Sequence, residues 1–221
     1  MDMTSALRGM AMVFLLLSSI AAAQTANHVV ISAFATRGGT VGNQPGEFVE
    51  LYNPTNAGIS IAGWRLEYQS ASGSSYSPLA TVPQGTVIRA RSFYLFAGTS
   101  WAGSPAADVV WTSSGLADNG NLRIVTATGQ VVDRVGYGTG NNPEGTPAPN
   151  HGDAANDNSV ERRASATSTA ASLATGGAEA RAGNGWDSGN NASDFVVQSN
   201  GRNPQNAMSA AEPPTAAGSG A

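Results

Sequence analysis

Residues 46–64 read GEFVELYNPTNAGISIAGW, and this stretch decides how the rest of the chain can fold. Its first part, residues 48–52, is a run of aromatic and aliphatic side chains that is typical of a strand packed on at least one face. This strand must end at Asn53-Pro54, because proline has no N–H to give to a neighbouring strand and restricts the residue before it. The turn signal NAG follows at residues 56–58, so we expect a second strand to begin at residue 59.

Further short strands are expected on both sides of this pair. The side chains of residues 64–69 alternate between apolar and polar, as in a half-buried strand, whereas residues 92–97 are apolar on both faces and indicate a central strand. A turn at Thr128-Gly129 joins two of the predicted strands into a β-hairpin. The predicted strands cover residues 29–35, 48–52, 64–69, 86–88, 92–97, 108–111, 122–125, 131–137, 159–162 and 194–197. Short strands at regular spacing, without a clear amphipathic helix, predict an all-β sandwich.

The two ends of the chain differ from the middle in composition. Arg8, an apolar run at residues 10–20 and the small residues before Gln24 form the pattern of a secretory signal peptide over residues 1–23. The apolar run is too short for the ~20 residues that a membrane span needs. We expect one domain over residues 24–208, with a flexible surface insertion at about residues 164–191 and a disordered tail over residues 209–221.

The composition limits the chemistry and the partners of the chain. There is no cysteine, which excludes a disulfide framework and thiol catalysis. The formal net charge is −4, and the 11 basic residues, all of them arginine, are scattered along the chain. Such a chain is a poor electrostatic match for nucleic acid, which we therefore disfavour as a partner. Together with the signal peptide, these features predict a secreted or periplasmic protein without a transmembrane segment in its mature form.

Four stretches of the chain resemble one known family. They are EFVELYN at residues 47–53, IAGWRL at 61–66, VPQGTVI at 82–88 leading into SFYLFAG at 92–98, and VDRVGYG at 132–138. NSVERR at residues 158–163 and the ending NPQN at residues 203–206 add weaker support. In this order and spacing they resemble the lamin tail domain, which occurs in nuclear lamins and in many secreted bacterial proteins.

The resemblance implies an immunoglobulin-like β-sandwich over about residues 28–208 in a secreted bacterial setting. It implies no reaction, since bacterial members occur alone or attached to hydrolases and share no catalytic residues. The chain lacks the coiled-coil rod and the nuclear localisation run of lamins, so a role as a nuclear scaffold does not follow.

Phe48, Glu50 and Tyr52 lie on one face of the strand at residues 48–52 and form a candidate surface binding site. A carboxylate between two aromatic rings could hold a sugar or a peptide. The structural alternative, which we favour, is that Glu50 pairs across the sheet with an arginine such as Arg65 or Arg134.

Asp133 shares a face with Val131, Val135 and Tyr137 on its predicted strand. If that face points into the sandwich, the carboxylate must be ion-paired or hydrogen-bonded there. We favour a structural role, because no second acid, histidine or serine lies at a recognisable catalytic spacing.

The loop NHGDAANDN at residues 150–158 concentrates oxygen ligands of the kind that calcium prefers, with Asp153, Asn156 and Asp157 as candidate ligands. It lacks the alternation of an EF-hand, and Asp and Asn are also ordinary turn residues, so a plain loop is the favoured interpretation. No other cofactor is expected. His28 and His151 have no neighbours at metal-ligand spacing, so zinc is not expected either.

Three classes of function remain open at this level, and one of them is a structural surface protein that self-associates through exposed strand edges. The favoured hypothesis is a non-enzymatic module that binds a cell-envelope component, a polysaccharide or a protein through its loops or an exposed sheet face. The alternative is a metal-assisted extracellular hydrolase whose active site would use Glu144, Asp153 and Asp157. No catalytic residue is assigned, because these acids lie in an irregular stretch, whereas catalysis needs polar groups held on rigid positions.

Overall fold

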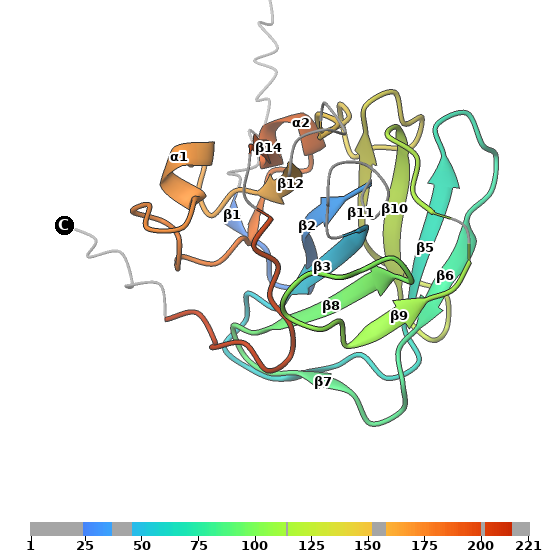
Figure 1. The fold of residues 1–221 in the computed structure, drawn as a ribbon, viewed down its shortest axis with the longest axis horizontal. Coiled ribbons are helices and arrows are strands. Elements are labelled where there is room, and N and C mark those ends of the chain that lie inside the picture. Colours follow the sequence, from blue (N-terminus) through green and yellow to red (C-terminus); the bar gives the residue numbers. More distant parts are fainter. Residues whose placement is uncertain (1–23, 37–45, 114, 152–157, 200–201, 214–221) are drawn as a thin grey trace, which may run out of the picture.

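A computed structural model of the chain describes residues 24–36, 46–113, 115–151, 158–199 and 202–213. The described residues form two main β-sheets, two small strand pairs and two short helices (Figure 1). No helix among them is long and apolar enough to cross a membrane.

The larger sheet has six strands, and neighbouring strands are antiparallel except β8 and β9, which run parallel. Its order is β14 (Phe195–Gln198), β12 (Ser159–Arg162), β2 (Val30–Ala35), β3 (Phe48–Tyr52), β8 (Phe93–Gly98) and β9 (Val109–Trp111). The smaller sheet has four antiparallel strands in the order β11 (Val131–Tyr137), β10 (Gly120–Val125), β5 (Arg65–Ser70) and β6 (Ser77–Thr81). The small pairs are β4 (Ile59–Ser60) with β7 (Val87–Ile88) and β1 (Gln24–Thr25) with β13 (Trp186–Asp187).

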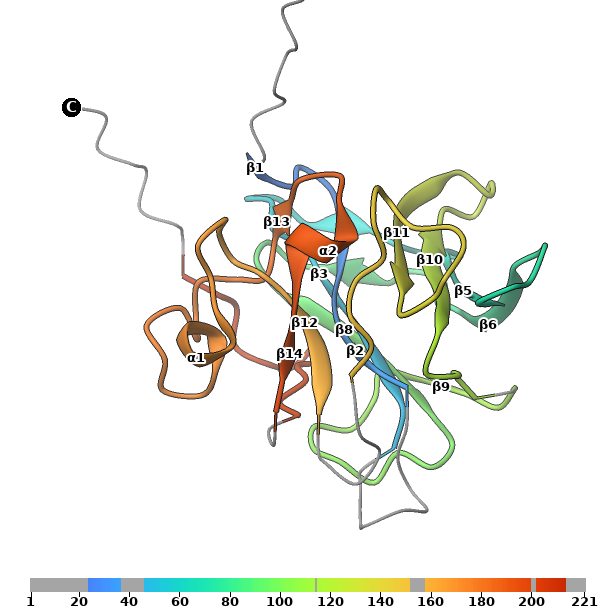
Figure 2. The same cartoon turned by 90° about the horizontal axis from the view of Figure 1, so that it is seen from above.

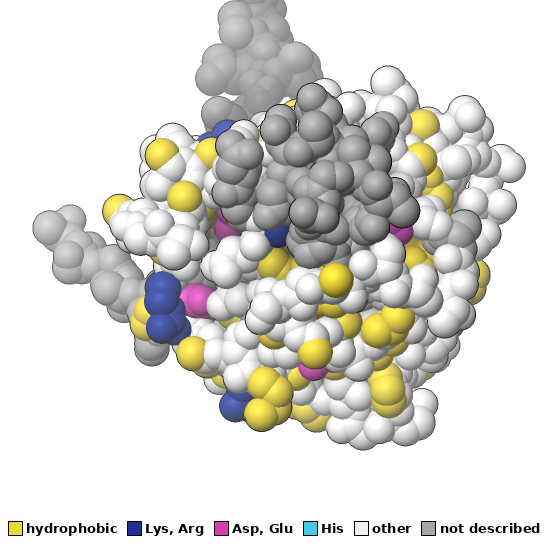
Figure 3. Space-filling model, in the orientation of Figure 1, with side chains coloured by type: hydrophobic (Ala, Val, Ile, Leu, Met, Phe, Trp, Pro, Cys, Tyr) yellow, Lys and Arg dark blue, Asp and Glu magenta, His cyan; other side chains and the backbone are white. Residues whose placement is uncertain are grey.

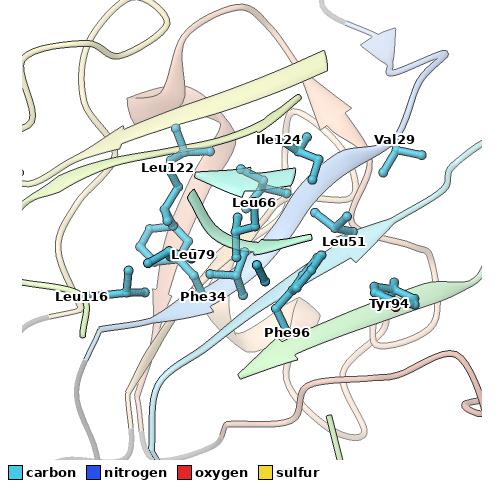
Figure 4. Close-up of a cluster of buried hydrophobic side chains, with 14 of the residues drawn as sticks. Val29, Phe34, Leu51, Leu66, Leu79, Tyr94, Phe96, Leu116, Leu122 and Ile124 are labelled. Carbon is cyan, nitrogen blue, oxygen red and sulfur yellow. The ribbon is translucent and has the colours of Figure 1, made fainter. Parts of the chain in front are cut away.

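The main hydrophobic core lies between the two sheets (Figure 4). Leu51 and Phe96 of the six-stranded sheet and Leu66, Leu122 and Ile124 of the four-stranded sheet are 0% exposed. Burial of such side chains stabilises each by about 1.5–3 kcal/mol relative to exposure. The predicted all-β sandwich is confirmed.

The outer face of the six-stranded sheet is also covered. Two later segments lie over it: residues 163–185, which contain the short helix α1 (Ala170–Leu173), and residues 203–213, which we call the C-terminal strap. Figure 2 shows α1 beside β12 and β14, and Figure 1 shows the strap in red next to β3 and β8. Every residue of β3 is therefore buried, although only alternate residues face the main core.

Most predicted strands are confirmed, with bounds that move by one or two residues. The predicted hairpin is β10–β11, with a register shift between Ile124 and Val125. The predicted strands do not include β6. Pro78 weakens its strand signal, but β6 is the edge strand of its sheet, where a proline is tolerated.

The structure differs from the sequence prediction in the C-terminal third. In place of a flexible insertion, residues 164–191 contain α1, β13 and the start of a second short helix, α2 (Asn191–Asp194). The Glu179 carboxylate accepts hydrogen bonds from Ser165 and Ser168 at 2.9 and 3.0 Å and a further one from Ser172, which closes the segment on itself. Disorder does not begin at residue 209 either, because the strap continues to Pro213 and buries Glu212.

Candidate functional site

Phe48, Glu50 and Tyr52 share one face of β3, but that face does not meet solvent. Their exposed fractions are 1%, 3% and 2%. Phe48 packs against Trp101 with its ring centroid 5.5 Å away, and Tyr52 packs against Phe93 at 4.9 Å. The expectation that the three form an exposed binding surface is therefore wrong, because it did not foresee the segments that cover the sheet.

Glu50 is held by partners other than the predicted arginines. Its Oε1 accepts a hydrogen bond from Ser32 Oγ at 2.6 Å, and its Oε2 accepts one from the backbone N–H of Gln205 at 2.5 Å. The predicted partners are engaged elsewhere: Arg65 pairs with Glu67 at 3.1 Å, and Arg134 donates to Asn142. Burial raises the pKa of Glu50 to about 8, because no cation compensates the desolvated charge.

The strand register places a second carboxyl near Glu50. Ala33 on β2 is opposite Glu50 on β3 and also opposite Glu161 on β12. The two acids are thus two strands apart on the same sheet face, with their Cα atoms separated by roughly 9–10 Å and only a methyl group between them. Burial also raises the pKa of Glu161, while hydrogen bonds with Gln198 and Asn184 lower it. The charge of Glu161 in turn contributes to the raised pKa of Glu50.

The two carboxyls line a cavity of about 270 Å³ between the sheet, the segment after α1 and the strap. The other polar lining groups are hydroxyls and amides: Ser159, Thr175, Asn184, Gln198, Ser199, Asn203 and Gln205. Among the described residues, the lining contains two acids and no arginine, lysine or histidine, so these lining groups carry negative charge when the acids ionise. Phe48 is the one aromatic residue in the part of the lining that the structure describes, and it is 1% exposed.

Asp133 occupies a second buried polar site, at the end of the sandwich where β11 meets β2. Its Oδ2 accepts from Arg162 Nη2 at 2.9 Å and from the Ile31 N–H at 2.6 Å. Burial raises the pKa of Asp133, and the Arg162 guanidinium opposes that rise. Asp133 therefore faces inward, and its carboxylate is ion-paired there as the sequence requires of an inward-facing acid; Arg162, at 0% exposure, is the cation.

Further acids surround Arg162. Its Nη1 lies 3.8 Å from an oxygen of Asp194 and 3.9 Å from one of Asp187. Burial, followed by the charges of Asp133 and Asp187, raises the pKa of Glu144 to about 7. Arg162 is the counter-ion of this cluster. In the described part of the chain, no group of three or more His, Cys, Asp or Glu side chains could hold a metal ion.

The predicted calcium ligands Asp153, Asn156 and Asp157 lie outside the described residues. Calcium binding by that loop therefore stays a prediction, and so does the hydrolase alternative, for which Glu144 is the only described acid. On the face in Figure 3, basic side chains of the described residues form small separate groups and no continuous patch.

A model of the lamin tail domain family matches residues 22–139. The chain belongs to the lamin tail domain family. Members of this family are non-catalytic, immunoglobulin-like modules, which agrees with the sandwich. No curated protein matches the chain.

The match runs from β1 to β11 and ends before β12. The lamin tail domain proper therefore supplies Ala33, Phe48 and Glu50 to the cavity, whereas Glu161 and both covering segments lie beyond the matched residues. The cavity combines a surface of the family domain with elements that follow it in this chain. Sequence reasoning placed Glu161 on a strand but missed its role, because no local signal shows that β12 adds to the sheet beside β2.

Proposed function

We propose that this chain is a secreted, non-enzymatic lamin tail module that binds a cationic side chain of an envelope protein in the cavity between Glu50 and Glu161. The observation that carries the proposal is a cavity whose described lining contains one buried acid, Glu50, one partly buried acid, Glu161, and no basic side chain. The proposal of secretion rests on the signal-peptide pattern of residues 1–23. The proposal that the module is not an enzyme rests on the non-catalytic nature of the family.

The charge and the shape of the cavity select the ligand class. Ionising the two carboxyls is costly while the cavity is empty, because no cation compensates their charge. A lysine ammonium or an arginine guanidinium that enters the cavity forms ion pairs with them, and such charge-assisted hydrogen bonds are stronger than neutral ones. An anion meets repulsion from the same two groups. A sugar finds no accessible ring to stack on, because Phe48 is covered, so we favour a protein partner over a polysaccharide.

Binding of a cation should release protons. Glu50, with a pKa of about 8, is mostly protonated at pH 7 in the empty cavity and must ionise to pair with the ligand. Calorimetry in two buffers of different ionisation enthalpy measures this release directly. A neutral ligand of the same length would release none.

The test titrates the full chain with cadaverine, which mimics a lysine side chain, and with two matched compounds, pentane-1,5-diol and glutarate. Cadaverine should bind with proton release, and Glu161→Gln should weaken it about tenfold, a loss of ~1.4 kcal/mol. Glu67→Gln is the control, because this buried acid pairs with Arg65 and Arg123 in the other sheet and does not line the cavity. Equal binding of cadaverine and the diol, or no binding of any of the three, would contradict the proposal.

A further inference from the structure

Three arginines and one acid lie together on the outer face of the four-stranded sheet. They alternate along β5, β10 and β11 with side chains of the main core, so they point away from the sandwich (Figure 2). The strand register places Arg134 of β11 opposite Arg123 of β10, and Arg123 opposite Glu67 of β5. Arg65 precedes Glu67 on the same face of β5. The group therefore carries an excess of positive charge, in a chain whose formal net charge is −4.

Glu67 joins two of these arginines. Its Oε1 accepts a hydrogen bond from Arg65 Nε at 3.1 Å. Its Oε2 accepts from Arg123 Nε at 2.7 Å and lies 2.6 Å from Arg123 Nη2. Glu67 is 4% exposed, whereas the side chains of Arg65 and Arg123 are 30% and 29% exposed. One carboxylate between two guanidinium groups is thus already part of this face, and both arginines stay accessible to solvent.

Arg134 lies on the other side of Arg123 and lacks such a carboxylate. Like charges that face each other on neighbouring strands destabilise a sheet. In the part of the chain that the structure describes, Arg134 forms no ion pair, and its Nη1 donates to the Asn142 amide oxygen at 3.2 Å. Burial raises the pKa of Glu144 and Arg134 lowers it, but these two side chains form no ion pair either. The space between Arg123 and Arg134 therefore lacks the negative charge that Glu67 supplies next to it.

The guanidinium groups are held in place without a ligand. Arg123 lies over the ring of Tyr76, with its Cζ 3.9 Å from the ring centroid. Arg134 is held by Asn142, and Arg65 Nη1 lies 3.5 Å from the Ala127 carbonyl. Donors that are fixed in advance lose little conformational freedom on binding, which favours affinity.

We infer that Arg123 and Arg134 bind a carboxylate that a partner protein presents as an aspartate or glutamate side chain. The bound carboxylate repeats the arrangement of Glu67 between Arg65 and Arg123, and it relieves the repulsion between the two cations. Guanidinium groups bind carboxylates through charge-assisted hydrogen bonds in a matching planar geometry. Arg123 already covers the face of Tyr76 on which a sugar ring would stack, so we favour a protein side chain over an acidic polysaccharide.

This site lies on the four-stranded sheet and shares no residue with the cavity of the proposed function. It takes a ligand of the opposite charge. The inference therefore does not rest on the proposed function, and either can fail alone.

The test follows the arginine side chains of the isotope-labelled full chain by NMR. The Nε–Hε signals are recorded while acetyl-Gly-Glu-Gly-amide is added, and acetyl-Gly-Gln-Gly-amide is the uncharged match. The Glu peptide should shift the signals of Arg123 and Arg134 saturably, with a Kd on the order of 1 mM, and the Gln peptide should shift neither. Added salt should weaken the binding, because the ion pairs are partly exposed to solvent.

Matched variants locate the binding. Arg134→Gln should weaken binding of the Glu peptide about tenfold, because it removes one of the two cations and keeps a polar side chain. Arg181→Gln is the control and should leave binding unchanged, since this 58% exposed side chain pairs with Glu212 and lies outside the site. Glu161→Gln should not change the peptide titration, and Arg134→Gln should not change the cadaverine titration, so the two proposals are tested separately.

Four outcomes would each overturn the inference. They are equal shifts with the Glu and Gln peptides, no saturable shift of either arginine, and an equal loss of binding in Arg134→Gln and Arg181→Gln. The fourth is binding of glucuronate or inorganic phosphate about tenfold or more tighter than that of the Glu peptide, which would make this a site for an acidic sugar or a phosphate group.

Discussion

Replacing Arg162 with methionine should be among the most destabilising single changes in this protein. The guanidinium is fully buried and makes three hydrogen bonds: to Asp133 Oδ2 at 2.9 Å, to the Ile31 carbonyl at 2.8 Å and to the Trp186 carbonyl at 3.0 Å. It also lies over the Phe195 ring at 4.6 Å. Methionine fills much of the volume but takes the arginine donor away from each of these acceptors, and Asp133 keeps only backbone N–H donors, from Ile31 and Arg134.

The magnitude follows from the charges that stay behind. Removal of one partner of a buried ion pair typically costs about 3–5 kcal/mol, and here Asp194 and Asp187 lose the same cation as Asp133. For a chain of this size, 1 kcal/mol lowers Tm by about 2–4 °C, so Tm should fall by roughly 6–20 °C. Urea titration followed by circular dichroism measures the change in unfolding free energy.

The pH dependence of this change has a definite sign. Burial already raises the pKa of Asp133, and without Arg162 the pKa should rise further. An acid whose pKa is higher in the folded state costs stability only where the unfolded chain is ionised, so the penalty grows as pH rises above about 4. The Arg162→Met defect should therefore be larger at pH 8 than at pH 5. Arg181→Met, at a 58% exposed side chain, is the control and should cost about 1 kcal/mol or less. A loss below about 1 kcal/mol for Arg162→Met, or no difference from the control, would refute the reasoning.

Three further substitutions test other parts of the structure. Glu50, with a pKa of about 8, is protonated in the folded chain but ionised when unfolded, so unfolding free energy should fall by up to ~1.4 kcal/mol per pH unit between about pH 5 and 8. Glu50→Gln should remove that slope in urea titrations across pH. Asn53→Asp should cost about 2–4 kcal/mol in the same assay, because the Asn53 amide donates to the carbonyls of Ala57, Ile88 and Arg89 at 2.8–3.1 Å and a carboxylate cannot. Gly136→Ala should lower the unfolding free energy by about 1–3 kcal/mol, since its Cβ would lie 2.8 Å from the backbone of Pro143. An unchanged Tm would contradict this, because it would show that the loop at Pro143 moves aside without cost.

The family domain was largely predictable because its signals are local. Alternation of apolar side chains and the turn residues around Asn53-Pro54 depend on a few neighbouring positions, and each such segment becomes a strand in the structure. The need of Asp133 for a partner was also predictable, because a buried carboxylate must be hydrogen-bonded or ion-paired. The sequence did not identify that partner as Arg162.

The candidate site was not predictable, because it is made of contacts between distant positions. Glu50 and the Gln205 N–H are 155 residues apart in the chain, and Ala33 joins Glu50 to Glu161 only through the order of three strands in the sheet. The sequence suggested that the outer face of β3 was exposed, since nothing in residues 48–52 shows what will lie over them. The sequence by itself therefore determined the strands, the sandwich and the family, whose signals are carried by neighbouring residues. Only the tertiary structure decided the cavity, because it forms where residues 163–185 and 203–213 cover the six-stranded sheet, and no local signal in the strands beneath predicts that cover.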